Sequence, residues 1–537
     1  MDRQDIGNQT NACVWIILRI MQNKITLCLG DNSSADAWAH KLTQKYSVEQ
    51  QIVFRGAVTN VDQNLQHGCY YTGPVNLQTA DILEVSKRFD KIVVLDQSQE
   101  QYSHSDIFVS MFRLVEFLEE KGTKVKILNE KIFSNIKYWQ NLIKKNKSFC
   151  IMPWIYHGGL GGNHTTCNNA GFGHTPLTKM NEITDWQKDK NFTEVRQKML
   201  AGVKIDRNCN ACYKNEFINE LSMRQNDTIK WVTELGLKST KDLENIKQPL
   251  YYEIRPSNKC NIMCRTCEPN YSHLIEKEAE KITDNYLKTI YPTKTWDEMT
   301  NFPSDIDHIH RLYVAGGEPT VSPELYNFLR KCIAENKTNF NFRINTNAVK
   351  INDTLIKLFK PFRNLGFSCS IDGIPRINDY IRWGTDTNTA IKNIHKLNEN
   401  HQIAFISVVS IYNIASIGEL LNFFDLEFPN AVLQLQKAGH PQDILSPFNH
   451  VDTDKVLRSL ELAKTTKCYW HSERGTKSMI DALYQHYASS HKIDNDKLTK
   501  FFYYNDALDR FRKSKLSDYI PDLEACRSYT LQELNNK

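Results

Sequence analysis

Three cysteines follow one another closely in the segment Cys260-Asn261-Ile262-Met263-Cys264-Arg265-Thr266-Cys267. Thiolates at such spacing are ligands for zinc or for an iron–sulfur cluster. A zinc site wants four ligands, usually as two pairs, so this loop would have to recruit a fourth ligand elsewhere. Three thiolates on one loop can instead bind three irons of a four-iron cluster, which leaves the fourth iron open to a chelating ligand. The spacing alone also allows three cysteines that only pack.

Polar groups recur downstream, each time where a strand is expected to end. Gly316-Gly317-Glu318-Pro319 offers backbone amides and carbonyls from its glycines, and Glu318 offers an anion for an ammonium group. Asn345-Thr346-Asn347 ends the next strand, and Ser368 to Gly373 ends the one after it. The carboxyl ends of parallel strands meet at one edge of a sheet, where such folds bind their ligands. The agreement of these segments with the cysteine loop favours one shared site.

The elements that must position these groups alternate between strand and helix over residues 249–437. The expected strands are Tyr251–Arg255, Arg311–Ala315, Asn341–Asn345, Gly366–Ile371, Ile403–Ile411 and Val432–Leu435. The expected helices are Ser272–Ile282, Pro323–Glu335, Asp353–Phe359, Thr389–Glu399 and Ile417–Phe424. This alternation predicts an α/β domain with a parallel sheet, either a partial barrel or a doubly wound sheet.

The cysteine loop, the Gly-Gly-Glu-Pro segment and the Ser-x-Asp-Gly segment at Ser370 to Gly373 resemble the radical S-adenosylmethionine (SAM) superfamily. The resemblance covers residues 249–437 and implies a partial (β/α)6 barrel. It implies a [4Fe–4S] cluster on Cys260, Cys264 and Cys267, with SAM chelating the unique iron through its amino and carboxylate groups.

The same resemblance implies where SAM binds. Gly316, Gly317 and Glu318 would contact its amino end. Asn347, Ser370 and Arg382 are candidates for its ribose and carboxylate, with Asp372 in a supporting role and the backbone of Ser407–Ile411 along the adenine.

The activity implied by the resemblance belongs mostly to the cofactor. A reduced cluster donates one electron to SAM, and the resulting 5′-deoxyadenosyl radical abstracts a hydrogen atom from an unactivated carbon of the substrate. No side chain has to act as a catalytic base in that first step. A flavodoxin- or ferredoxin-type reductant would supply the electron, and the substrate would be a peptide or a small molecule.

A second set of cysteines, Cys150, Cys167, Cys209 and Cys212, precedes the core. Four thiols suit zinc as well as a cluster. Their surroundings, with Met199-Leu200-Ala201-Gly202 and Ser222-x-Arg224, resemble the twitch or SPASM auxiliary-cluster module, here upstream of the core as in a phage-associated group. That resemblance implies an auxiliary [4Fe–4S] cluster for electron transfer or substrate binding.

One departure from that module puts its ligand set in question. Cys167 is followed by Asn168, where such modules often have paired cysteines. His157, His164 and His174 lie nearby and could replace a ligand, although solvated loop histidines are the simpler expectation.

Composition bounds the remaining possibilities. Of the 537 residues, 41% are hydrophobic and 24% are charged, a composition typical of globular proteins. The net charge of only +5 argues against nucleic-acid binding by charge. The run Ala12–Leu18 stops at Arg19, short of the ~20 residues of a membrane span, and lacks the features of a secretory signal. We therefore expect a cytoplasmic protein, in the host cytoplasm if phage-encoded, with reduced thiols. The isolated cysteines at 13, 28, 69, 332, 369, 468 and 526 are expected to pack, with Cys369 pointing away from the SAM site.

Four segments are expected along the chain. Residues 1–140 read as an α/β, Rossmann-like domain, in which Gly30 to Ser34 after the first strand could hold an anion or simply cap a helix. The cluster module would span 145–235, the radical SAM core 245–440 and a helical C-terminal region 441–537.

The alternative is a zinc-stapled binding protein without redox activity, suggested by the pairs Cys209–Cys212 and Cys264–Cys267. Their separation far exceeds the usual 15–20 residues, and a zinc module has no use for Gly-Gly-Glu-Pro. A degenerate family member that binds SAM without cleaving it is disfavoured by the intact cysteine loop.

Overall fold

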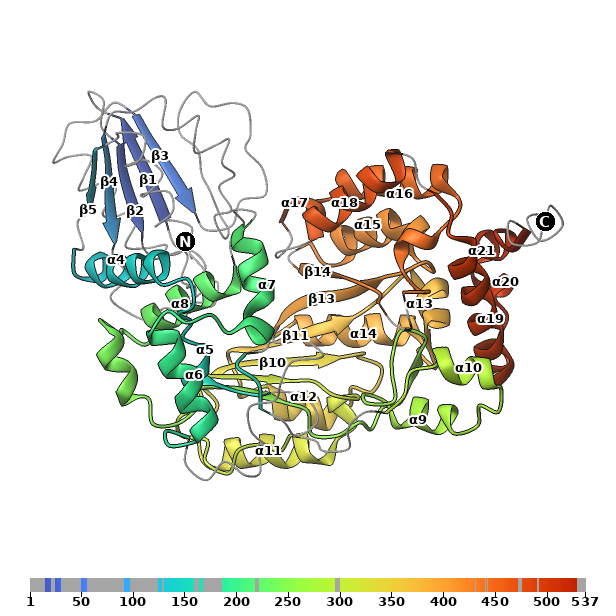
Figure 1. The fold of residues 1–537 in the computed structure, drawn as a ribbon, viewed down its shortest axis with the longest axis horizontal. Helices are drawn as coiled ribbons and strands as arrows, with labels where there is room; N and C mark the ends of the chain where they lie inside the picture. The colour runs from blue at the N-terminus through green and yellow to red at the C-terminus, as the bar shows by residue number, and fades with distance from the viewer. Residues whose placement is uncertain are drawn as a thin grey trace, which may run out of the picture. The chain divides into compact units, whose positions relative to one another are not determined.

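A computed structural model of the chain (Figure 1) divides it into two compact units. The N-terminal unit comprises residues 1–155, 169–175 and 185–247, and the C-terminal unit comprises 156–168, 176–184 and 248–537. The structure describes residues 15–20, 25–29, 50–55, 91–96, 124–127, 130–158, 164–167, 186–217, 222–294, 300–429, 431–439, 441, 443–471, 476–489 and 492–528.

The N-terminal unit contains two small sheets. Strands β2 (Ile25–Leu29), β4 (Lys91–Asp96) and β5 (Lys124–Ile127) pair in parallel in the order β2-β4-β5. Strand β1 (Trp15–Ile20) pairs antiparallel with β3 (Gln50–Arg55). From the sequence, strands were expected at Lys24–Gly30, Gln51–Gly56, Lys91–Asp96 and Lys124–Leu128, all in one parallel sheet. The second of them, β3, instead pairs antiparallel with β1, which was not predicted, so that part of the prediction was wrong. The turn at Gly30 to Ser34 and the helices expected between the strands lie outside the described residues.

The remaining described elements of this unit are helices. It contains α4 (Glu130–Lys145), α5 (Met152–Ile155), α6 (Lys190–Leu200), α7 (Asp206–Phe217), α8 (Met223–Glu234) and the 3-10 helix η2 (Thr240–Asn245). Its core stacks the rings of Trp139 and Phe149, whose centroids are 5.6 Å apart, and Phe149 in turn packs on Trp154. This packing fixes the chain on both sides of Cys150.

The C-terminal unit is built on a parallel sheet of seven strands, in the order β14-β13-β11-β10-β9-β7-β6. Six strands match the prediction: β7 (Tyr251–Ile254), β9 (Arg311–Val314), β10 (Asn341–Thr346), β11 (Leu365–Ser370), β13 (Gln402–Val409) and β14 (Val432–Lys437). The seventh, β6 (Tyr156–His157), pairs with β7 and was missed, because two residues carry no periodicity. The α/β fold class is confirmed, and the sheet is consistent with a partial barrel.

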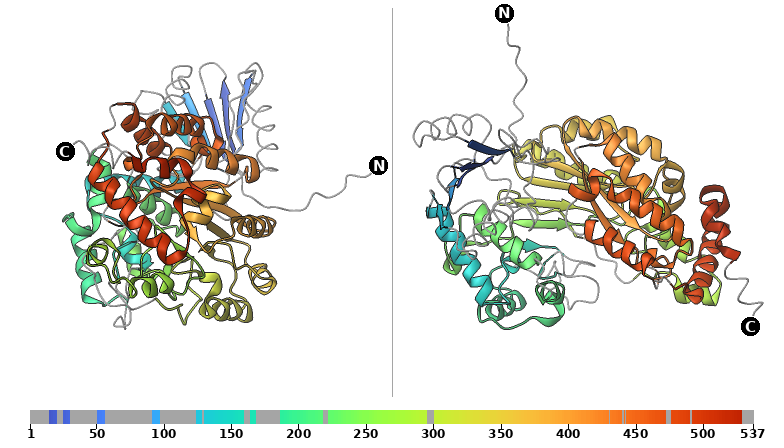
Figure 2. Two further views of the ribbon diagram at one scale, coloured as in Figure 1. Left: turned by 90° about the vertical axis from the view of Figure 1, so that its right-hand side faces the viewer. Right: turned by 90° about the horizontal axis from the view of Figure 1, so that it is seen from above.

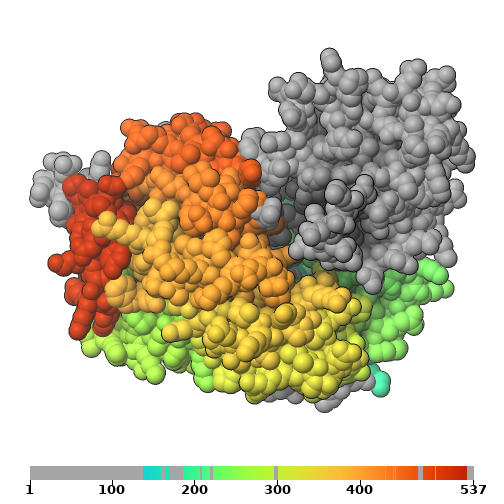
Figure 3. Space-filling view, turned by 180° about the vertical axis from the view of Figure 1, so that it is seen from behind, coloured from blue at the N-terminus to red at the C-terminus, as the bar shows by residue number. Residues whose placement is uncertain are grey.

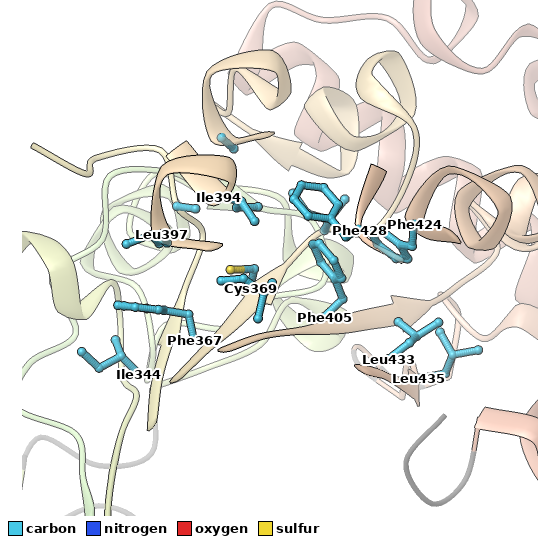
Figure 4. Packing of buried hydrophobic residues seen from close by; sticks show 14 of the residues in the cluster. Ile344, Phe367, Cys369, Ile394, Leu397, Phe405, Phe424, Phe428, Leu433 and Leu435 are labelled. Carbon is cyan, nitrogen blue, oxygen red and sulfur yellow. The ribbon is translucent and has the colours of Figure 1, made fainter. Parts of the chain in front are cut away.

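Helices cover one face of this sheet (Figure 1), and the space-filling view from behind shows the surface of the C-terminal unit in yellow to red (Figure 3). They include α11 (Pro323–Ala334), α12 (Asp353–Phe359), α14 (Thr387–Asn398) and α15 (Ile417–Glu427). Figure 4 shows Phe367 and Cys369 of β11 and Phe405 of β13 packed toward this helical layer, in one cluster of buried side chains. Side chains alternate along a strand, so Gly366, Ser368 and their counterparts on other strands lie on the opposite, inner face. The expectation that Cys369 points away from the candidate site is confirmed.

The predicted helical C-terminal region is also confirmed. It contains α16 (Thr453–Lys464), α17 (Lys467–His471), α18 (Thr476–Ala488), α19 (Asn495–Arg512), α20 (Leu516–Tyr519) and α21 (Pro521–Ala525). Helix α19 lies beside α9 (His273–Ala279) and α10 (Asn285–Ile290) (Figure 2), and shares a second apolar cluster with them and with α13 (Pro375–Ile381). No helix in the described part of the chain is long and apolar enough to cross a membrane.

Candidate functional site

The cysteine loop leaves β7 alongside the segment that leaves β9, and the two remain hydrogen-bonded beyond the strands. The amide of Ala315 donates to Ile254 O at 2.9 Å, that of Gly317 to Ser257 O at 3.0 Å, and that of Glu318 to Lys259 O at 2.7 Å. The backbone of the loop is therefore fixed up to the residue before Cys260.

This close approach explains the two glycines. A Cβ on Gly317 would lie 2.1 Å from Lys259 O, and Gly316 has a φ of +123°, which side chains rarely adopt. The sequence interpretation gave both glycines free amides. The structure corrects this for Gly317, whose amide is used by the loop.

The three thiols of the loop lie close enough to act on one another. Burial, and after it the neighbouring Cys264, raises the pKa of Cys260 to about 12. The pKa of Cys267 is raised by burial and then by both other cysteines. A bound metal reverses this effect, because coordination deprotonates a thiol outright. The donor set therefore fits a group that binds all three thiolates.

A single metal ion is a different case. Within the described ranges, no three His, Cys, Asp or Glu side chains form a group that could hold one ion.

Cys264 is held by a short antiparallel pair, β8 (Met263–Cys264) with β12 (Arg382–Trp383). In this pair Arg382 lies opposite Cys264, and its Nη1 is 3.8 Å from the Cys264 Sγ. The Arg382 Nε forms an ion pair at 2.8 Å with Asp372 Oδ2. The sequence-predicted Arg382 is thus brought to the cysteine loop, and Asp372 orients its guanidinium.

Asp372 also fixes the backbone predicted to run along the adenine. Its Oδ1 accepts a hydrogen bond of 2.8 Å from the amide of Val408 in β13. The side chain of Asp372 is fully buried. The supporting role expected for Asp372 therefore has a structural basis in two separate contacts.

Glu318 ties the ends of β9 and β10 together. Its Oε1 accepts from the hydroxyls of Thr320 and Thr346, at 2.6 and 2.7 Å, and from the amide of Thr320. Its Oε2 accepts from the amide of Asn347 at 2.7 Å. A carboxylate oxygen has two lone pairs, so Oε2 keeps acceptor capacity for one further donor such as an ammonium group. Burial raises the pKa of this carboxyl.

Asn347 joins this network to the cysteine loop. Its Nδ2 donates to Asn261 Oδ1 at 2.9 Å. Among the described residues the Nδ2 of Asn261 is buried without a hydrogen-bond partner, which leaves a donor between Cys260 and Cys264 for a bound group. Ser370 reaches only Asn345, at 3.5 Å, and is 8% exposed. The structure thus brings Asn347 into direct contact with the cysteine loop, whereas Ser370 lies on the inner face of β11.

The C-terminal helix α19 holds the cysteine loop from its other side, which sequence reasoning missed. Arg265, between two of the cysteines, is 1% exposed, and its guanidinium forms an ion pair of 2.5 Å with Asp509. It also bonds Asn505 and stacks 3.7 Å above the ring of Tyr380. The sequence signal for this contact was a charged residue inside the predicted ligand loop, but the sequence does not identify the partner of that residue.

A second arginine, which belongs to α19, also anchors the cysteine loop. Arg512 Nη1 donates to the backbone carbonyl of Met263 at 2.9 Å, next to Cys264. The rest of its guanidinium pairs with Glu278 of α9. The cysteine loop is therefore anchored through side chains on one side and through the strand ends on the other.

Comparison with known proteins agrees with this geometry. Residues 254–424 match the family model of the Radical SAM superfamily. The chain carries a radical SAM domain. No curated protein matches the chain.

Several solved structures are similar over part of the chain. SuiB of Streptococcus suis bound to S-adenosylmethionine is 15% identical, with a TM-score of 0.28, over 51% of this chain and 59% of SuiB. Native anSMEcpe with bound AdoMet and Kp18Cys peptide is 14% identical, with a TM-score of 0.27, over 48% of this chain and 66% of that one. Archaeal TYW1 is 14% identical, with a TM-score of 0.20, over 30% and 50%. This chain spans less than two thirds of each of these proteins.

Outside the radical SAM domain, three of the four upstream cysteines belong to the N-terminal unit. Cys209 and Cys212 lie one turn apart on α7 and are buried. Burial, and after it the neighbouring Cys212, raises the pKa of Cys209 to about 11. Cys150 follows Phe149, whose carbonyl accepts a hydrogen bond of 2.8 Å from Arg224 Nη1.

Arg224 connects these parts of the module. It also pairs with Glu216 of α7, through bonds of 2.8 and 2.7 Å. Ser222 caps α8 in a capping box with Gln225. The Ser222-x-Arg224 pattern therefore starts a helix and links the Cys150 segment to α7. The fourth cysteine, Cys167, belongs to the C-terminal unit.

The histidines near Cys167 differ from the expected solvated loop residues. His164 is fully buried and its Nε2 is 2.9 Å from His157 Nδ1. Burial lowers the pKa of His157 to about 4. His157 belongs to β6 and its ring lies against that of Tyr252 in β7, with centroids 5.1 Å apart; it is half-buried, whereas His164 is buried. His174 lies outside the described residues.

Proposed function

We propose that the protein is a radical SAM enzyme that cleaves SAM reductively and abstracts a hydrogen atom from its substrate. One observation carries this proposal: three mutually interacting thiols stand at the carboxyl end of β7, framed by the Gly316-Gly317-Glu318 segment and by Arg382. Bound to the three thiolates, the [4Fe–4S] cluster supplies the electron that cleaves SAM to a 5′-deoxyadenosyl radical.

The residues of the chain bind and orient SAM. Glu318 Oε2 and the carbonyls beside it suit the amino end of SAM, because they present acceptors to an ammonium group. Arg382 suits the carboxylate, since Asp372 occupies its Nε and leaves other donors free to reach a ligand. Asn347 and Ser370 stay candidates for the ribose, and the backbone of 407–411 for the adenine.

The upstream cysteines are proposed to hold an auxiliary [4Fe–4S] cluster of the twitch or SPASM type. The closeness of Cys209 and Cys212 and the link from Arg224 to the Cys150 segment support this. Cys167 is proposed as the fourth ligand, and this proposal rests on the sequence pattern alone. Such a cluster would accept an electron from the substrate radical, making the net reaction an oxidation, or would bind the substrate.

A flavodoxin- or ferredoxin-type protein is the proposed reductant, and a peptide or small molecule the proposed substrate. We place the enzyme in the cytoplasm, that of a host cell if the chain is phage-encoded. The proposed reductant and the proposed location both rest on the reducing chemistry that the cluster requires.

The decisive experiment is anaerobic reconstitution followed by iron and sulfide analysis and an assay of 5′-deoxyadenosine after SAM and dithionite are added. We expect about eight irons per chain, and about four with no deoxyadenosine when Cys260, Cys264 and Cys267 become Ala. The variant with Cys209→Ala and Cys212→Ala tests the auxiliary cluster separately, by losing about four irons. Zinc without iron, and no deoxyadenosine, would leave the zinc-stapled alternative and refute the proposal.

A further inference from the structure

The inner face of the seven-stranded sheet carries a row of polar side chains across its middle. Glu253 of β7 is aligned with Tyr313 of β9, Tyr313 with Arg343 of β10, and Arg343 with Gly366 of β11. Their strand neighbours Ile254, Val314, Ile344 and Phe367 are buried under the helices, so the row faces the other way.

Arg343 lies flat on this face. A Cβ on Gly366 would stand 3.1 Å from the Arg343 Cζ, so the guanidinium occupies the space above the glycine. Arg343 is half-buried, and among the residues that the structure describes it forms no hydrogen bond or ion pair. Its guanidinium carries a permanent charge and five donors.

The carboxylate in the row is already used. Glu253 forms an ion pair with Arg255 at 2.5 Å, and it accepts a bond of 3.0 Å from the hydroxyl of Tyr156. The Nε of Arg255 is buried without a partner. This part of the inner face therefore holds two guanidinium groups and one carboxylate, an excess of one positive charge, and the carboxylate is paired with Arg255 rather than with Arg343.

A half-buried cation without a counter-ion is expensive unless a ligand neutralises it. An excess of one charge matches a carboxylate, since a phosphate carries about −1.5 to −2. Arginine binds a carboxylate with two parallel hydrogen bonds. Tyr313, Asn345 and Ser368 surround the position with further polar groups on the same face.

We propose that Arg343 binds a carboxylate of the substrate, with Arg255 as a second donor. The proposal rests on the radical SAM function and names its substrate class: a molecule with a free carboxylate near the carbon that loses hydrogen. The carboxylate of SAM is a separate group. Arg343 precedes Thr346, at the strand end beside Glu318, by three residues, or about 10 Å along the strand.

The test measures binding of matched probes to the reconstituted full-length protein by calorimetry. The probes are acetyl-Gly-Glu-Gly-amide, acetyl-Gly-Gln-Gly-amide and glutarate. We expect the Glu peptide or glutarate to bind at least about tenfold more tightly than the Gln peptide, because an ionised hydrogen bond is replaced by a neutral one. Preference for the Glu peptide would indicate a peptidic source of the carboxylate, and preference for glutarate alone a small molecule.

Three variants make the result specific to Arg343. Arg343→Gln should abolish the preference, and Arg343→Lys should retain part of it. Arg330→Gln, on the exposed surface of α11, removes the same charge elsewhere and should bind as the wild type does. Equal binding of all probes, no binding at all, or a preference that survives Arg343→Gln would overturn the inference. Deoxyadenosine release by the wild type is measured in the same preparation, so failure of the proposed function is seen independently.

Discussion

Replacing Asp509 by Ala tests whether helix α19 positions the cysteine loop. Asp509 is the ion-pair partner of the buried Arg265 and also accepts from the hydroxyls of Tyr380 and Ser514 and from the amide of Leu516. Removing one partner of a buried ion pair costs about 3–5 kcal/mol, because the remaining charge is left uncompensated. Donors left unsatisfied add to this cost, although such effects are not additive.

We expect Asp509→Ala to lower the free energy of unfolding by about 3–5 kcal/mol, which is a large part of the stability of an ordinary domain. Asp509→Asn keeps acceptors for Arg265 and Tyr380 but loses the charge, so its effect should be smaller. Urea denaturation followed by circular dichroism measures both. Because Arg265 lies between Cys264 and Cys267, we also expect Asp509→Ala to lose iron and to alter the EPR spectrum of the reduced cluster.

Tyr503→Phe is the matched control on the same helix. Tyr503 donates to Asp284 at 2.6 Å in an exposed hydrogen bond that involves neither Arg265 nor Arg512. Its loss should cost less than about 1 kcal/mol and leave the EPR spectrum unchanged. If Asp509→Ala unfolds within about 1 kcal/mol of the wild type and keeps the same iron content and spectrum, α19 does not position the loop.

Three further outcomes follow from the structure. Gly317→Ala should displace Lys259 and reduce both iron content and deoxyadenosine release at least about tenfold, whereas Gly236→Ala, with open space around it, should cost only about 1 kcal/mol of stability. The pKa of His157 is lowered to about 4, so the folded chain keeps this side chain neutral at pH values where the unfolded chain binds a proton. The free energy of unfolding should therefore fall by about 1.4 kcal/mol per pH unit as the pH drops from about 6.5 toward 4. His157→Gln should flatten this slope in urea titrations. Arg224→Met should remove about four irons, since it releases the Cys150 segment from α7, while deoxyadenosine release persists; full iron retention would count against the auxiliary site.

The parts of the site that sequence could predict are those in which chemistry and local order coincide. The cysteine loop and the Gly-Gly-Glu segment each combine their ligand groups with the end of an apolar strand, so type, spacing and position all point to one edge. The strands themselves were predictable because they are buried runs bounded by turns. β6 escaped because its two residues depend on the partner β7 for their conformation.

Other features depend on packing that no local pattern records. The interpretation of the histidines near Cys167 failed for this reason: a glycine-rich surrounding predicts a solvated loop, yet His164 is buried against His157 and β6. The antiparallel pairing of β1 with β3 was likewise missed, because an alternation of strands and helices predicts parallel neighbours and the segment of β1 was not predicted to be a strand.

The arginine network shows most clearly why a ligand loop cannot be judged from its own residues. Three thiolates bind a cluster only if the loop holds them at the right separation, and a loop of eight residues has too few internal contacts to do this alone. Here the position between the second and third cysteines is used by Arg265, whose partner Asp509 lies 244 residues further along the chain. We therefore expect the helical C-terminal region, which carries no chemical motif, to support the proposed cluster site, and its integrity to determine whether the cysteine loop can bind iron.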